Sequence, residues 1–449
     1  MVTGIKLNKI NFENLFLNIF IFLTIVILFL NFFVLHPIYP SSDEIVAVER
    51  YTEWWKFLRK DSVGNHVINS FIAVIIKSIF GFNFLYYRFV SFFSFCLIIF
   101  IFKKMYPSTI AYFILIFLIL TSQMLTSYIY IFRGYYTWAF LTVLNFYFIK
   151  NYISNNFDNR NYNIILFLNL IMACHAIFTF YIVIPTLLII FFTAIKKKDL
   201  KKIYSFFIIF LIPFSFFYFI ASVLEGFVNN FTQNLTLNYL LNNFFYIVKV
   251  GFFSGFNSIF FSGHTMQYLT DDNVFIKVFN QLTTRSEVYD YQFTILFIYI
   301  ISCLILIFRI LKKKINIIDW ILIFIIIFFY TLKFVPEIRV HVGIVYFFIF
   351  YIFENIYNLI LNINKKEKFK FFFLSLFLFF LFFNIDSPDN KISIDTKKEL
   401  INIRNLKKIY SCSELNNILN EHEIWITKNI FSKDCSSKYD FINNKNILF

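Results

Sequence analysis

The sequence predicts an α-helical membrane protein that crosses the bilayer many times. Of its 449 residues, 59% are hydrophobic and 23% are aromatic, which is more apolar surface than a soluble domain can bury. Apolar runs of about 20 residues, long enough to cross a bilayer as helices, recur along the whole chain. These runs are continuous rather than alternating, so a β-barrel is not expected.

The charge distribution predicts the orientation of the chain. A formal net charge of +15 can indicate a nucleic-acid partner, but here the basic residues cluster in every second break between the apolar runs. These clusters are Lys6 with Lys9, Lys103 with Lys104, 150–160, 196–202, 309–314 and 365–370. This is the positive-inside pattern, so we expect a cytoplasmic N-terminus and no nucleic-acid partner.

The apolar runs predict about eleven transmembrane helices. In chain order they cover residues 15–35, 85–102, 108–127, 134–149, 164–174, 181–194, 203–223, 293–310, 317–332, 340–361 and 371–385. The first run is too long for the core of a signal peptide and has no small-residue cleavage site, so we expect it to be retained. The runs 164–174 and 181–194 form either a tight hairpin, with His175 near its turn, or one broken helix. Only the hairpin keeps the alternation of charge.

The breaks without basic clusters are expected to face outward. They are the first loop (36–84), short turns near 128–133 and 333–339, and a large loop (224–292). We therefore predict a transmembrane domain over 1–385 and a polar extracytoplasmic segment over 386–449. Cys412 and Cys435 lie in that segment, on an oxidising side, where either a disulfide or two free thiols are open alternatives.

The first loop holds most of the candidate chemistry. Apolar side chains recur at helical spacing over 43–60, which predicts an amphipathic helix on the membrane surface that begins at Asp43 and Glu44. Capping of that helix is an alternative role for Asp43. The stretch 67–80 is too short to span the membrane easily and predicts a second juxtamembrane helix, which begins after His66.

Several cations are predicted on the same membrane face as these carboxylates. They are Arg88, Arg133, Arg285, Lys333 and Arg339. An arginine at a helix end can reach the interface, whereas one buried towards the bundle requires an anionic partner. Cations grouped with carboxylates suit a site that holds a lipid phosphate while a carboxylate accepts a proton.

The order of these motifs resembles the GT-C membrane glycosyltransferases. The closest group is the protein O-mannosyltransferase-like one (glycosyltransferase family 39-like), which includes the bacterial aminoarabinose transferases. The resemblance rests on the pair Asp43-Glu44, a downstream His66, the Arg-x-x-Ser motif at Arg88 and the Arg-x-Tyr motif at Arg133. It covers roughly residues 15–149. The chain departs from the family pattern after the histidine, where valine and isoleucine replace the usual prolines, and segment 386–449 matches no family motif.

The resemblance implies an inverting transfer of a sugar from a polyprenyl-phosphate carrier to an extracytoplasmic acceptor, at a bacterial inner membrane. On this model Asp43 is the general base and Glu44 a supporting carboxylate. Arg88 and Arg133 stabilise the phosphate leaving group. His66 either shapes the site and binds substrate or is a structural histidine.

The remaining predicted ligands are less specific. Arg285 lies in the large loop, and Lys333 and Arg339 flank a later turn; all three are candidate phosphate ligands. A divalent metal can bind near the loop carboxylates, but no ligand spacing requires one. The sugar is open, and so is the acceptor, which is a glycan, a lipid or a protein.

Two other functions are open. A transporter or flippase of lipid-linked glycans would place charges in mid-helix, where this chain has only Glu354 and Asp319. A polymerase of lipid-linked glycans also uses polyprenyl carriers, but it does not need the early pair Asp43-Glu44.

Overall fold

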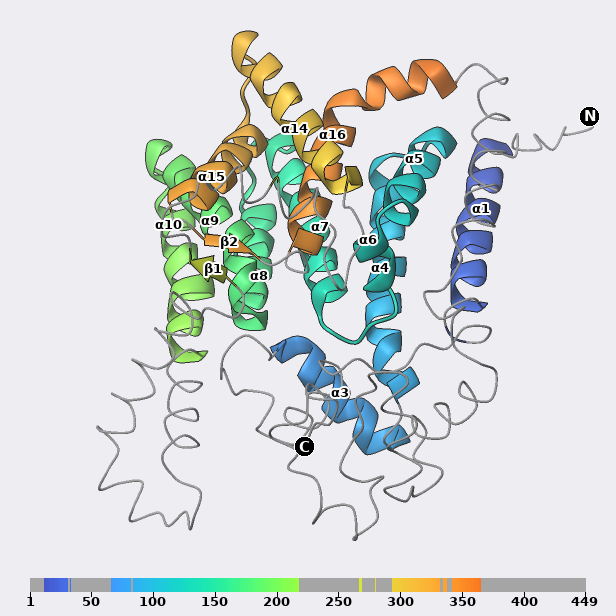
Figure 1. Ribbon diagram of the computed structural model, residues 1–449. Coiled ribbons are helices and arrows are strands. Elements are labelled where there is room, and N and C mark those ends of the chain that lie inside the picture. Colours follow the sequence, from blue (N-terminus) through green and yellow to red (C-terminus); the bar gives the residue numbers. More distant parts are fainter. Residues whose placement is uncertain are drawn as a thin grey trace, which may run out of the picture.

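The computed structural model describes residues 12–30, 33, 66–81, 84–217, 266–268, 279, 293–331, 334–336 and 341–364. These residues form a helical bundle (Figure 1). Four of the helices are long and apolar enough to cross a membrane: Leu85–Met105, Leu200–Phe217, Phe293–Leu311 and His341–Asn362. Shorter apolar helices accompany them. The predicted class, an α-helical membrane protein, is therefore confirmed at this level.

Every predicted span except the last contains a described helix. The helices are α1 (Phe12–Phe29), α3 (Val67–Phe80), α4 (Phe84–Met105), α5 (Thr109–Leu120), α6 (Gln123–Ser127), α7 (Tyr135–Ser154), α8 (Asn159–His175), η4 (Ile177–Thr179), α9 (Phe180–Lys196), α10 (Leu200–Ser205), η5 (Phe206–Leu211), α14 (Phe293–Leu311), α15 (Ile317–Thr331) and α16 (His341–Asn364). The last predicted span, 371–385, lies outside the described residues, as do 43–60 and 386–449 with its two cysteines.

Local chemistry explains where two predicted helices differ from those observed. The predicted helix 108–127 is divided into α5 and α6, because the Ser122 side chain accepts a hydrogen bond from the Leu125 N–H and starts a new helix. The run 164–174 is extended at its start, because Asp158 caps α8 by accepting from the Asn161 N–H. The alternative of a hairpin is confirmed, since α8 ends at His175 and α9 is a separate helix packed against it.

Helices α4, α7 and α16 run parallel through the centre of the bundle. Contacts between α7 and α16 occur in ascending order, from Trp138 beside Gly343 to Lys150 beside Glu354. Contacts between α4 and α7 also occur in ascending order along both helices, from Ser94 beside Thr137 to Lys104 beside Tyr147. All three helices therefore begin at one end of the bundle. Helix α3 lies across that end, which is at the bottom of Figure 1.

The helices expose apolar side chains and bury polar ones, as expected in lipid. Helix α3 buries Asn69 and Ser70, whereas its Phe71 and Ile79 are 41% and 66% exposed. Helices α10, η5 and α14 are also lined with exposed phenylalanine, leucine and isoleucine. Because water would penalise such a surface, a bilayer is the environment that this surface fits.

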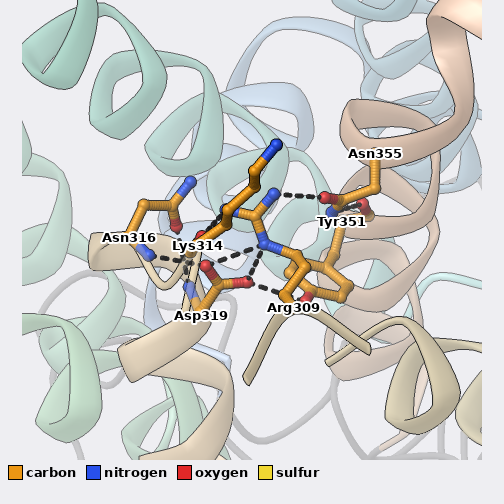
Figure 2. Close-up of polar contacts among 6 residues, drawn as sticks. All are labelled: Arg309, Lys314, Asn316, Asp319, Tyr351 and Asn355. Carbon is orange, nitrogen blue, oxygen red and sulfur yellow. Dashed lines mark hydrogen bonds and ion pairs between the residues drawn. The ribbon is translucent and has the colours of Figure 1, made fainter. Parts of the chain in front are cut away.

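A polar cluster joins α14, α15 and α16 (Figure 2). The Arg309 Nε–H donates to Asp319 at 2.8 Å, and its other nitrogens donate to Asn355 and to the Lys314 carbonyl. Tyr351 also donates to Asp319. Asn316 and Asp319 cap each other's backbone N–H groups at the start of α15. The carboxylate of the fully buried Asp319, on α15, thus accepts hydrogen bonds from α14, from α16 and from the Asn316 N–H.

The described residues also include a short antiparallel pair of strands that the sequence did not predict. Strand β1 (Met266–Tyr268), from the large loop, pairs with β2 (Phe334–Pro336), from the later turn. These two predicted outward breaks are therefore joined.

Candidate functional site

Three of the predicted site residues lie in the described part of the chain, and they gather at one end of the bundle. These are His66, Arg88 and Arg133, whose exposed fractions are 3%, 1% and 5%. We call this region the site end: His66, the first turns of α4 and α7, and the turn 128–134 between α6 and α7. The other predicted residues lie outside the described residues: Asp43, Glu44, Arg285, Lys333 and Arg339.

The Arg-x-x-Ser motif ties α4 to the turn that carries Arg133. Ser91 lies one helical turn after Arg88 and donates its hydroxyl hydrogen to the Ile131 carbonyl at 2.8 Å. The Tyr87 ring lies 5.5 Å from the Phe132 ring, between centroids. Arg88 directly follows Tyr87 and Arg133 directly follows Phe132, so the contact between these two rings joins the chain neighbours of the two arginines. These two contacts join the start of α4 to the turn that carries Arg133.

Gly134 brings His66 into contact with the start of α7. Its φ is +67°, a left-handed conformation that glycine adopts without strain. A Cβ atom placed on Gly134 would lie 2.6 Å from the Cβ of His66, closer than two such atoms can approach. Glycine is therefore required here both for the backbone turn and for the approach of α3.

His175, at the end of α8, also contacts this turn. Its Nε2 lies 3.1 Å from the Gly134 carbonyl oxygen, and its ring lies 5.5 Å from the His66 ring. Tyr135 and Phe178 pack on His66 with ring centroids 5.0 and 5.2 Å away. Two buried histidines and an aromatic cluster therefore surround Gly134.

A second polar connection joins α3, α7 and α4. Thr137 donates to the side-chain oxygen of Asn69 at 2.5 Å and lies 3.4 Å from the Ser94 hydroxyl. All three side chains are buried. Buried hydrogen bonds of this kind fix the relative position of the helices that carry them, so α3 is held against the start of the bundle.

The described residues of the site end carry several positively charged groups. Helices α4 and α7 begin here with their N–H groups and positive dipole ends, and α16 begins at the same end of the bundle. Arg88 and Arg133 add two buried positive charges. Arginine suits the planar or tetrahedral oxygen groups of carboxylates and phosphates.

Two histidines at these helix ends had no role in the sequence prediction. His341, the first residue of α16, is 1% exposed, and its Nδ1 lies 2.6 Å from the Tyr299 hydroxyl. His175 was expected only near a turn. Each is a single histidine beside an apolar run, and no motif or spacing distinguishes it from a packing residue.

Among the described residues, no three His, Cys, Asp or Glu side chains lie together in a group that could hold a metal ion. Comparison with known proteins adds no family to this picture. Neither a protein-family model, nor a curated protein, nor a solved structure matches the chain.

Proposed function

We propose that the chain is an inverting glycosyltransferase that moves a sugar from a polyprenyl-phosphate carrier to an extracytoplasmic acceptor. The observation that carries this proposal is the site end, where His66, Arg88 and Arg133 are each buried near the starts of α3, α4 and α7. A phosphate leaving group gains negative charge as the sugar departs, and buried arginines at helix N-termini would stabilise that charge.

In the proposed reaction, Asp43 accepts the proton of the acceptor hydroxyl, and the freed oxygen attacks the anomeric carbon of the sugar. The bond from that carbon to the phosphate oxygen breaks on the opposite face, so the configuration inverts. The carrier leaves as polyprenyl phosphate, held by Arg88 and Arg133. Glu44 is a supporting carboxylate, and Arg285, Lys333 and Arg339 are further proposed phosphate ligands.

The proposed topology places the N-terminus in the cytoplasm and the site end outside it, in a membrane crossed about eleven times. The parallel directions of α4, α7 and α16 support this proposal, because the positive-inside alternation requires these three helices to cross in the same sense. The basic residues Lys103 and Lys104, at the far end of α4, are then cytoplasmic.

The contacts of Asp319 and Glu354 weigh against the transporter or flippase. Asp319 is held by Arg309 in the cluster of Figure 2. Glu354 lies 2.7 Å from the Lys150 ammonium and accepts from the Tyr106 hydroxyl at 3.0 Å. Burial, together with this carboxylate, raises the pKa of Tyr106 well above its usual value, so the phenol remains a donor. Both carboxylates therefore have structural partners at the end of the bundle opposite the site end.

Turnover with polyprenyl-phosphate sugars in detergent tests the proposed reaction. The wild-type protein is expected to release free polyprenyl phosphate when an acceptor is supplied, and Asp43→Asn is expected to abolish release, because an amide cannot accept the proton. Arg160→Ala is the control, since Arg160 is exposed at the start of α8. Near-normal turnover by Asp43→Asn in folded protein would refute the role of this residue.

A further inference from the structure

We infer that His175 is a positioning residue that fixes Arg133 for phosphate binding by holding the carbonyl of Gly134. This inference rests on the proposed function. It assigns a role to a buried histidine that lies far from the first loop in sequence and belongs to none of the motifs described above.

The turn that carries Arg133 is anchored on both sides of this residue. On one side, Ser91 of α4 donates to the Ile131 carbonyl at 2.8 Å. On the other, His175 of α8 lies 3.1 Å from the Gly134 carbonyl. Two hydrogen bonds from different helices thus hold the backbone two residues before Arg133 and one residue after it.

The chemistry of the second anchor determines how His175 acts. Because a carbonyl oxygen can only accept, the Nε2 of His175 must carry a hydrogen and donate it. The same oxygen accepts from the Trp138 N–H at 2.9 Å, within the first turn of α7. Gly134 also has no side chain to restrict its backbone. Loss of His175 would remove one hydrogen bond to the Gly134 carbonyl and leave the one from the Trp138 N–H.

The geometry of His175 makes the anchor specific for a donor at Nε2. The residue is fully buried at the last position of α8, and the turn that follows it is held separately, by hydrogen bonds from Thr179 to the Met172 and Ala176 carbonyls. The α8–α9 turn therefore has its own support. Loss of the histidine donor should affect Gly134 and Arg133 more than the fold of the turn.

Affinity for a polyprenyl phosphate, measured with the full-length protein in detergent, tests this role. His175→Leu fills the site without a donor and is expected to weaken binding about tenfold, because a displaced Arg133 loses part of its charged hydrogen bonding to the phosphate. His175→Gln places an amide N–H at the position of Nε2 and is expected to bind within about twofold of wild type. His175→Asn is too short to reach the carbonyl and should behave like the leucine variant.

A double-variant cycle separates positioning from general destabilisation. If His175 acts through Arg133, then His175→Leu has no further effect on affinity in an Arg133→Ala background, whereas unrelated effects would add. Thr179→Val is the matched control, because it removes hydrogen bonds within the turn between α8 and α9 but leaves the hydrogen bond from His175 to Gly134 in place. It is expected to leave the affinity unchanged.

Three results would overturn the inference. Wild-type affinity in folded His175→Leu contradicts it, and so does additivity in the cycle. Should the leucine variant not fold, equal affinities of the Gln and Asn variants contradict it. If Arg133→Ala weakens binding while His175→Leu does not, only the positioning role fails. Absence of binding by the wild-type protein instead removes the proposed function.

Discussion

At the scale of single residues, Gly134 is the position on which the geometry of the site end depends most. It adopts a left-handed φ, lies against His66, and presents the carbonyl that His175 and Trp138 share. Nothing in the sequence distinguishes it from the other eight of the nine glycines. Its importance follows only from the approach of α3, which brings His66, 68 positions earlier in the chain, into contact with Gly134.

Substitution of Gly134 by alanine should therefore destabilise the protein. The left-handed backbone costs about 1–2 kcal/mol for an alanine, and the contact with His66 adds a further penalty of about 1–3 kcal/mol for overpacking. Thermal unfolding in detergent measures this loss. Adding His66→Gly to Gly134→Ala should restore part of the stability, because the colliding atoms belong to the His66 side chain. A wild-type melting temperature for Gly134→Ala would contradict the contact.

The predicted site residues divide according to the kind of signal that identified them. Arg88 and Arg133 were predicted from charge at the ends of apolar runs, and the structure brings their chain neighbours into contact. His175 and His341 were not predicted, because a buried hydrogen bond to a carbonyl or a tyrosine leaves no periodicity or spacing in the sequence. Their partners, Gly134 and Tyr299, are each about 40 positions away.

At the scale of elements, hydrophobic length predicted the helices well and their breaks poorly. The predicted second juxtamembrane helix, 67–80, coincides with α3. The helix 108–127, by contrast, is interrupted where Thr121 and Ser122 compete for backbone hydrogen bonds. An apolar run specifies that a helix crosses the bundle, but capping side chains decide where that helix begins and ends.

The cluster around Asp319 gives a prediction at this scale. Asp319→Ala should lower the free energy of unfolding by about 3–5 kcal/mol, because it leaves Arg309 without its carboxylate partner. Chemical denaturation in detergent measures the change. The folded variant should still bind a polyprenyl phosphate with unchanged affinity, since the cluster lies away from the site end. Loss of binding in a folded, stable variant would revive the transporter, in which Asp319 has a functional role.

At the scale of the whole molecule, the proposed orientation can be tested with single cysteines. All five native cysteines are first replaced by serine. Ser78, on α3, and Ser154, at the end of α7, are both exposed. In intact cells, Ser78→Cys should react with a membrane-impermeant maleimide, whereas Ser154→Cys should react only after lysis. The reverse pattern would overturn the proposed topology.

The most direct test of the central claim is the affinity of the site end for a lipid phosphate. We expect the purified protein to bind a polyprenyl phosphate more tightly than the uncharged polyprenol. Arg88→Ala and Arg133→Ala should each weaken phosphate binding by a factor of about 10 to 100, the usual cost of a lost charged hydrogen bond, and Arg160→Ala should not. Equal affinity for the phosphate and the alcohol, or wild-type affinity in both arginine variants, would contradict the account.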